Sequence, residues 1–196
     1  MSIVKTENLH KKYPEPGKKK EFFYAVNGTS LSIEAGEIYG ILGPNGAGKT
    51  TTLEMMEGLT DIDEGDAWVD GISVKQEPYK VKKIIGVQLQ ANEYFDHLNL
   101  SELIALFSQL YNRHDDPLDL LDHVNLKEKA QAKPKELSGG QQQRFSIACA
   151  LVHEPKVLFL DEPTTGLDPQ AKRNIWELVK NLNNKGMTIV LTTHNM

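Results

Sequence analysis

The sequence holds a single cysteine, Cys149, among its 196 residues. One cysteine cannot form a disulfide within the chain, so a fold stapled by internal disulfides is excluded. Cys149 falls on the apolar face of a predicted helix. We interpret it as an inert core thiol of a protein from a reducing compartment.

Long apolar runs and an excess of basic residues are also lacking. No run approaches the ~20 apolar residues of a membrane-spanning helix, and the opening MSIVKTENLH has no apolar core of a secretory signal. Lys plus Arg is 22 against 27 for Asp plus Glu, so the net charge of −5 gives no indication of nucleic-acid binding. We expect a cytoplasmic protein that reaches a membrane only through a partner.

What is present indicates an α/β fold, because apolar strand patterns alternate with helical ones. Strands are predicted at residues 38–42, 157–161 and 187–193, with a helix at 49–58 after the first. Asp168 as cap and Pro169 at the first helical position begin another helix, which Gly186 ends before the last strand. With 39% hydrophobic residues, the chain suffices for one sizeable core.

Two segments depart from this alternation. Residues 91–137 are predicted to form an inserted helical subdomain. Asn99 caps its first helix and Asp116-Pro117 begins its second; the residues expected to face inward are Leu100, Leu103, Ile104, Phe107, Leu110, Tyr111, Leu118, Leu121 and Val124. The first 35 residues and residues 66–74 are predicted as short antiparallel strands, with residues 11–20 (KKYPEPGKKK) as a solvated loop.

Residues 43–50, GPNGAGKT, fit the phosphate-binding pattern G-x-x-x-x-G-K-[ST] between a predicted strand and a predicted helix. Its glycines let backbone N–H groups wrap a phosphate, and the dipole of the following helix adds to this. Lys49 is expected to reach the β- and γ-phosphates, and the Thr50 hydroxyl to bind Mg²⁺.

Residues 157–164, VLFLDEPT, are an apolar strand that ends in two acids. A carboxylate at the carboxyl end of a central strand faces the ligand crevice of an open α/β sheet. Asp161 is therefore predicted to hold the metal, and Glu162 to act as general base for an attacking water.

Residues 137–144, LSGGQQQR, begin a helix. Ser138 and Gln141 fit a capping box, but capping does not require Gly139 and Gly140. Bare glycines at a helix N-terminus leave N–H groups open to an anion, and this could be the nucleotide of a second copy. A capping box alone is the commoner explanation, and the residues themselves leave both readings open.

The order of these motifs resembles ATP-binding cassette (ABC) ATPases over nearly the whole chain, with LSGGQQQR similar to their signature sequence. Glu162, His194, Lys49 and Gln90 then match catalytic residues, and Thr50, Gln90 and Asp161 match the Mg²⁺ ligands. Residues similar to the ATP-binding set are Tyr13, Gly43, Pro44, Asn45, Gly46, Ala47, Gly48, Lys49, Thr50, Thr51, Ser138, Gly139, Gly140 and Gln141. Residues 165–168 resemble the family's D-loop.

Several matches have ordinary alternatives. Tyr13 could be a half-buried hairpin aromatic, Gln90 a polar strand end with Gln88 nearby, and Asp168 simply a helix cap.

The resemblance implies a P-loop NTPase (RecA-like) parallel-sheet core with an N-terminal antiparallel β-subdomain and an inserted α-helical subdomain. Residues 1–196 would form a single nucleotide-binding domain. The family normally continues past the histidine that His194 resembles, so we expect a C-terminally incomplete domain.

Within the family, GPNGAGKTT, TTGLDP and SELIALFSQLYN resemble ATPase subunits of bacterial ABC-2 type multidrug or ion exporters. This implies ATP and Mg²⁺ as cofactors, a homodimer across the nucleotide, and a separate transmembrane permease that holds it at the inner face of the cell membrane. The alternative is a non-transport ABC ATPase that acts on ribosomes or DNA.

Overall fold

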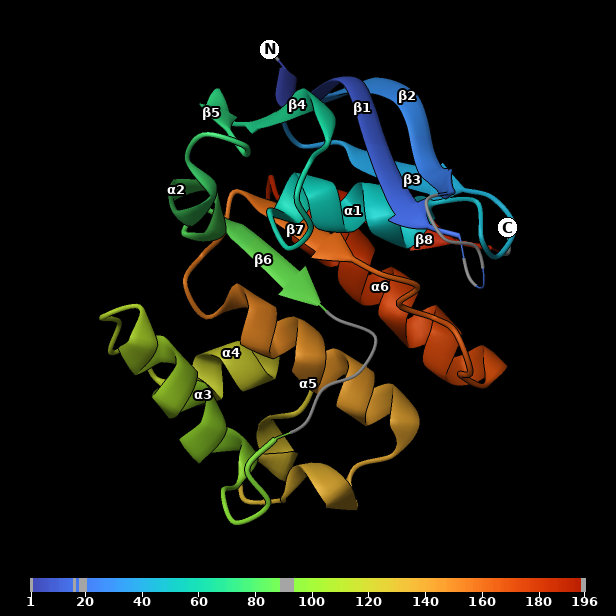
Figure 1. Ribbon diagram of the computed structural model, residues 1–196. Helices are drawn as coiled ribbons and strands as arrows, with labels where there is room; N and C mark the ends of the chain where they lie inside the picture. Colours follow the sequence, from blue (N-terminus) through green and yellow to red (C-terminus); the bar gives the residue numbers. More distant parts are fainter. Residues whose placement is uncertain (1, 16, 18–20, 89–93, 195–196) are drawn as a thin grey trace.

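The computed structural model describes residues 2–15, 17, 21–88 and 94–194, which form two sheets with helices between and below them (Figure 1). The antiparallel sheet has the order β2-β1-β4-β5, from β1 (Ser2–Pro14), β2 (Phe22–Glu34), β4 (Glu64–Val69) and β5 (Ile72–Ser73). The parallel sheet has the order β3-β8-β7-β6, from β3 (Ile38–Leu42), β6 (Ile85–Gln88), β7 (Val157–Leu160) and β8 (Thr188–Thr193).

Both faces of β7 and β8 are buried, which explains the apolar residues along these strands, whereas the edge strand β3 leaves Ile38 and Leu42 exposed. Val157, Phe159 and Val190 pack in one cluster with α1 (Lys49–Glu57) and the antiparallel sheet. Their neighbours Leu158 and Leu160 point the other way, into a second cluster with α5 (Gly139–Leu151) and α6 (Pro169–Asn184). The alternation of side chains along a strand thus divides the core into two layers.

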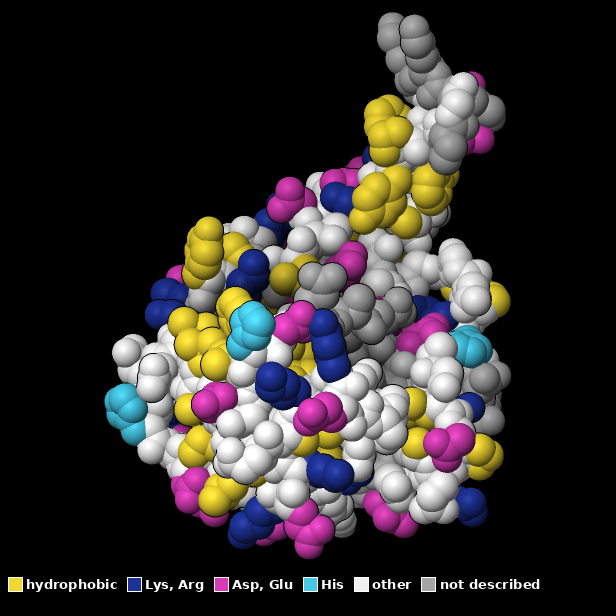
Figure 2. All heavy atoms as spheres, turned by 90° about the horizontal axis from the view of Figure 1, so that it is seen from below, with side chains coloured by type: hydrophobic (Ala, Val, Ile, Leu, Met, Phe, Trp, Pro, Cys, Tyr) yellow, Lys and Arg dark blue, Asp and Glu magenta, His cyan; other side chains and the backbone are white. Residues whose placement is uncertain are grey.

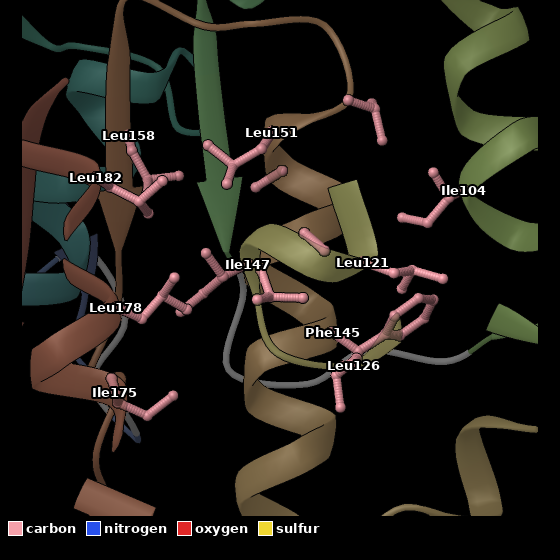
Figure 3. Packing of buried hydrophobic residues seen from close by; sticks show 14 of the residues in the cluster. Ile104, Leu121, Leu126, Phe145, Ile147, Leu151, Leu158, Ile175, Leu178 and Leu182 are labelled. Carbon is pink, nitrogen blue, oxygen red and sulfur yellow. The ribbon is translucent and has the colours of Figure 1, made fainter. Parts of the chain in front are cut away.

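The second cluster also joins α3 (Leu100–Leu110) and α4 (Pro117–His123) to the sheet. In Figure 3, Ile104 and Leu121 lie on the Phe145 side of α5, while Leu158 lies by Leu182. Two 3₁₀ turns, Lys127–Lys129 and Pro134–Glu136, connect α4 to α5, and a short α2 (Pro78–Lys82) precedes β6. None of the helices in the described ranges is long and apolar enough to span a bilayer.

The predicted α/β class, the parallel core and the antiparallel N-terminal sheet are confirmed. Asn99 and Asp168 cap their helices as expected. Residues 91–137 carry α3, α4 and both 3₁₀ turns in their described part, from 94 onward; their standing as a separate subdomain stays a prediction.

Three expectations were wrong in detail. β1 and β2 are 13 residues each rather than short, and Lys11–Pro14 lie in β1, because the strands continue as a long hairpin beyond the rest of the sheet. Leu110 and Tyr111 are 71% and 43% exposed, because the buried stripe of α3 runs through Leu103 and Ile104 and ends before them. Leu118 is also exposed, at the first turn of α4.

Candidate nucleotide site

The phosphate-binding loop lies between β3 and α1, where its glycines are structurally required. Gly48 is the N-cap of α1 and has φ 83°, a left-handed conformation. A Cβ atom there would lie 2.1 Å from the carbonyl oxygen of Ala25 in β2. Glycine at position 48 therefore permits both the turn and the close approach of the loop to the neighbouring strand.

Lys49 follows as the first residue of α1 and is buried. Its Nζ donates hydrogen bonds to the carbonyl oxygens of Gly43, at 2.9 Å, and Pro44, at 3.1 Å. The same Nζ lies 3.5 Å from Oε1 of Glu162. The loop therefore curls around its own ammonium group, which is the position from which a lysine can contact a bound phosphate.

Thr50 and Asp161 meet although 111 residues separate them in the chain. The Thr50 hydroxyl donates to Oδ2 of Asp161 at 3.0 Å, at the carboxyl end of β7. A hydroxyl beside a carboxylate fits Mg²⁺, which prefers oxygen ligands and takes the rest of its shell from water and substrate phosphates. The described residues contain no group of three His, Cys, Asp or Glu side chains for a cage made of protein alone.

Glu162 is held by four groups. Its backbone has φ 47°, and its N–H donates to the Thr192 hydroxyl at 2.8 Å. Its Oε2 accepts from Thr165 Oγ1 at 2.9 Å and lies 3.1 Å from Nδ1 of His194. Burial alone would raise the pKa of the Glu162 carboxyl, but the hydrogen bonds from Thr165 and His194 and the charge of Lys49 together lower it. The group is thus a carboxylate at neutral pH and can accept a proton.

A cavity of about 530 Å³ runs from these groups to the β1–β2 hairpin. At the hairpin end Tyr13 and Phe23 line it with Ala25; the ring centroids of Tyr13 and Phe23 are 6.2 Å apart. The other end is polar, and Asn45, Gly46, Gly48, Lys49, Thr50, Thr51 and Glu162 line it. An aromatic end and a cationic, N–H-rich end together match a nucleobase and a polyphosphate.

The hairpin also carries exposed aromatics. Phe22 is 62% exposed and Tyr24 48%, and Figure 2 shows hydrophobic side chains on the arm that stands out from the body of the molecule.

The helix that LSGGQQQR begins is α5, and its capping box is present. The Ser138 hydroxyl accepts from the N–H of Gln141, while the N–H of Ser138 donates to Oε1 of Gln141 at 2.9 Å. This N-terminus lines a separate cavity of about 180 Å³, together with Asp168 and other residues at the start of α6. The two cavities share no lining residue, so the structure does not bring Ser138–Gln141 together with the phosphate-binding loop of the same chain.

The two glycines of this helix differ in their surroundings. A Cβ at Gly140 would lie 2.7 Å from Cβ of Ala171 in α6, whereas a Cβ at Gly139 would meet only Leu167, at 3.7 Å. Gly140 is therefore explained by close packing of two helices. Packing does not explain Gly139.

Gln90 lies outside the described residues, so its predicted role stays a prediction. Gln88, the alternative, ends β6 and is buried, and its carbonyl oxygen accepts from the N–H of Asp161. Sequence reasoning missed Thr192 and Thr165, which hold Asp161 and Glu162 by hydrogen bonds. A threonine in a strand or a tight turn carries no sequence signal for such a contact.

Comparisons with known proteins agree with this geometry. A family model described as "ABC transporter" matches residues 26–165. The linearmycin resistance ATP-binding protein LnrL of Bacillus subtilis is 39% identical over 199 residues, covering 99% of this chain and 62% of that protein. The Nod factor export ATP-binding protein I of Burkholderia lata is 44% identical over 176 residues, covering 87% of this chain and 58% of that protein. The chain thus spans about three fifths of these relatives.

Among solved structures, a dimeric post-hydrolysis state of the ATP-binding cassette MJ0796 bound to ADP and Pi superposes with a TM-score of 0.86 at 33% identity. The alignment covers 98% of this chain and 88% of that one. Since the family model covers most of the chain and the strand order, phosphate loop and paired acids agree with it, the chain belongs to the ABC transporter family, as its ATP-binding cassette.

Proposed function

We propose that this protein binds Mg-ATP in the 530 Å³ cavity and hydrolyses it to power an exporter. The observation that carries the proposal is the meeting of Lys49, Thr50, Asp161 and Glu162, with His194 behind them. In this cavity the nucleobase of ATP would stack on Tyr13. The phosphates would lie on the loop from Gly43 to Thr50, with Thr51 beside it.

The protein's own groups divide the chemistry among them. Lys49 and the loop N–H groups would stabilise the charge that develops on the transferred phosphoryl group. A magnesium ion held by Thr50 and Asp161 would supply further charge neutralisation when bound. Glu162, ionised and anchored by Thr165 and His194, would accept the proton of the attacking water.

Helix α5, which begins with two glycines, supports a dimer. Ser138, Gly140 and Gln141 line a different cavity from the phosphate loop, so in our proposal they and the adjacent Gly139 bind the nucleotide held by another copy. Support comes from the dimeric ATP-binding cassette whose structure this chain resembles.

Export through a separate membrane permease is proposed from the relatives, one of which is named for Nod factor export. The cargo contacts would lie in that permease. The protein would then lie on the cytoplasmic face of the membrane through its partner.

The test is phosphate release from ATP by the wild-type protein and by Glu162→Gln. The amide keeps the shape of the side chain but cannot take a proton, so turnover should fall by about 10²-fold or more while nucleotide still binds. Glu177→Gln, an exposed glutamate of α6, is the matched control. Equal turnover in Glu162→Gln and wild type would overturn the proposed role of Glu162.

A further inference from the structure

Thr192 places a buried hydroxyl in β8, the strand between β3 and β7, and is 0% exposed. The three residues before it, Ile189, Val190 and Leu191, belong to the two hydrophobic clusters of the core. Valine has the shape of threonine without the hydroxyl and would suit such a strand. Since a buried hydroxyl is costly unless it is hydrogen-bonded, its partners indicate its role.

Two hydrogen bonds join the Thr192 hydroxyl to the acidic pair that follows β7. Its oxygen accepts from the backbone N–H of Glu162 at 2.8 Å. A hydroxyl has one proton to donate, and Oδ1 of Asp161 lies 2.5 Å away as its acceptor. Thr192 therefore joins the side chain of the proposed metal ligand to the backbone of the proposed general base.

The register of the sheet brings these groups together. The last residues paired between β7 and β8 are Leu160 and Leu191, and Asp161 and Thr192 come directly after them. Side chains two residues apart in a strand share a face, so Asp161 lies on the face of Phe159 and Thr192 on the face of Val190. Phe159 and Val190 pack in the same cluster with α1, so both polar side chains lie on the side of the sheet that α1 covers.

The backbone of Glu162 needs to be held in place. Its φ of 47° is left-handed, a conformation that is unfavourable for a residue with a Cβ and persists only where the surroundings hold it. Thr165 and His194 hold the carboxylate at Oε2, and the N–H of Thr165 donates to the carbonyl oxygen of Glu162 at 3.1 Å. The Thr192 hydroxyl holds the remaining polar group of this residue, its N–H.

The Asp161 carboxylate lies between two hydroxyls. Thr50 donates to Oδ2 at 3.0 Å, and Thr192 donates to Oδ1. A magnesium ion held by Thr50 and Asp161 would draw on this same carboxylate. Because carboxylate, hydroxyl and N–H form one continuous hydrogen-bonded chain, a change at Asp161 reaches the backbone of Glu162 through a single side chain.

We propose, on the basis of the proposed ATP hydrolysis, that Thr192 is a positioning residue that links the place of the general base to the metal ligand. Thr192 is not among the residues that line the 530 Å³ cavity, so it would act through Asp161 and Glu162 rather than on the nucleotide. Its loss should therefore slow the chemical step more than it weakens nucleotide binding.

Thr188 offers a matched control in the same strand. It is 1% exposed, and its hydroxyl oxygen accepts from the N–H of Gly36 at 2.9 Å. It lies on the same face of β8 as Thr192 but at the other end, opposite Val157 at the start of β7. Thr188→Val and Thr192→Val both remove a buried hydroxyl that accepts from a backbone N–H, and only the second change touches the acidic pair.

The first test is steady-state ATP hydrolysis at saturating Mg²⁺. In Thr192→Val, kcat should fall about tenfold or more while KM changes about twofold or less, and Thr192→Ser, which keeps the hydroxyl, should retain about a third or more of the wild-type kcat. Thr188→Val should turn over as wild type does, and urea unfolding checks that both valine variants are folded. A wild-type kcat in Thr192→Val, or an equal loss in Thr188→Val, would overturn the proposal.

The second test follows the Glu162 amide by NMR and needs no turnover. In protein labelled with ¹⁵N-glutamate, this amide gives the signal that is missing from Glu162→Gln. Adding Mg²⁺ to the ADP-bound wild type should shift the signal, and in Thr192→Val the shift should shrink by about half or more. No Mg²⁺-dependent shift in wild type, with ADP binding confirmed by calorimetry, would overturn the link between Asp161 and Glu162. A wild type that binds no nucleotide would instead overturn the proposed function, and this is seen before any Thr192 variant is made.

Discussion

At the scale of single residues, the nucleotide site consists of charged side chains joined by ion pairs and hydrogen bonds. Lys49 faces the phosphate loop and Glu162, while Asp161 accepts from Thr50 and Thr192. Because these groups are buried or nearly so, removing one takes a partner away from a neighbour that has little water to replace it. Substitutions here should act strongly and specifically.

Lys49→Ala should weaken Mg-ATP binding by about tenfold or more, because a charged hydrogen bond of about 1.5–3 kcal/mol is lost. Isothermal titration calorimetry measures the change. Lys180→Ala, an exposed lysine of α6, is the control and should bind as wild type does. An unchanged affinity in Lys49→Ala would rule out the assigned phosphate contact.

Glu57, the last residue of α1, predicts a pH dependence of stability, because it is buried and its Oε1 has no hydrogen-bond partner among the described residues. Its pKa is about 8 in the folded protein against an ordinary glutamate value of 4.5, so the folded state binds the proton more tightly than the unfolded chain does. The stabilisation is complete below about pH 4.5 and is lost as pH rises through the folded pKa. Between about pH 5 and pH 8 the free energy of unfolding should therefore fall less in Glu57→Gln than in wild type. The difference between the two falls should be about 2 kcal/mol or more.

Urea unfolding of wild type and Glu57→Gln at several pH values measures this difference. Parallel curves for the two proteins would mean that Glu57 is not the buried, unpaired acid that the structure shows.

At the scale of elements, the start of α5 packs against the start of α6. Gly140 lies so close to α6 that a Cβ atom there would meet Ala171, whereas a Cβ atom at Gly139 would not meet α6. Substitutions at Gly140 therefore test helix packing, and substitutions at Gly139 test ligand binding in our proposal.

Gly140→Ala should lower the free energy of unfolding by about 1–3 kcal/mol, because its Cβ would lie 2.7 Å from Cβ of Ala171. Gly139→Ala, whose Cβ would make only an ordinary contact with Leu167 at 3.7 Å, should be neutral or slightly stabilising, since alanine favours helices. Chemical denaturation compares them. Equal stabilities of the two variants would contradict the packing described for α5 and α6.

Gly139→Asp should leave ATP binding by the single chain intact and abolish turnover. Its carboxylate would stand at the helix N-terminus, where our proposal places the γ-phosphate of the other copy, and like charges repel. Calorimetry measures ATP binding, and phosphate release measures turnover. If nucleotide binding itself were lost, α5 would act within its own chain and the proposed exchange between copies would be wrong.

The elements differ in how far the sequence predicted them. β3, β7 and α6 were predictable because apolar runs indicate buried strands, Asp-Pro indicates the start of a helix, and glycine indicates its end. The exposure of Leu110 and Tyr111 was not, because helical periodicity assigns a face but not where the neighbouring layer ends. The length of β1 was hidden by the lysines and prolines of residues 11–20.

The candidate site divides in the same way. Lys49, Thr50, Asp161 and Glu162 were predictable because the phosphate loop and the acidic strand end each carry a pattern with a mechanism. Thr192, by contrast, is one β-branched residue in a strand of such residues, and only the register of β7 and β8 brings it to Asp161. Outside this site, the burial of Glu57 was missed because a glutamate near a helix end is ordinarily a solvated residue.

At the scale of the whole molecule, one copy carries two separate cavities, which our proposal assigns to two halves of a nucleotide site. The phosphate loop, the aromatic pair and Glu162 line one, and the start of α5 lines the other. In our proposal a second copy supplies the missing part to each nucleotide, so ATP itself would hold the two copies together until hydrolysis. Oligomeric state and catalysis are then linked.

Light scattering on Glu162→Gln, with and without Mg-ATP, shows whether nucleotide holds two copies together. The variant should still bind nucleotide but should not activate water, so the sandwiched dimer should accumulate. We expect the mass to double when Mg-ATP is added and to fall back when Gly139→Asp is introduced in the same chain. A monomer at saturating Mg-ATP, with nucleotide binding confirmed in the same sample, would contradict the proposed dimer.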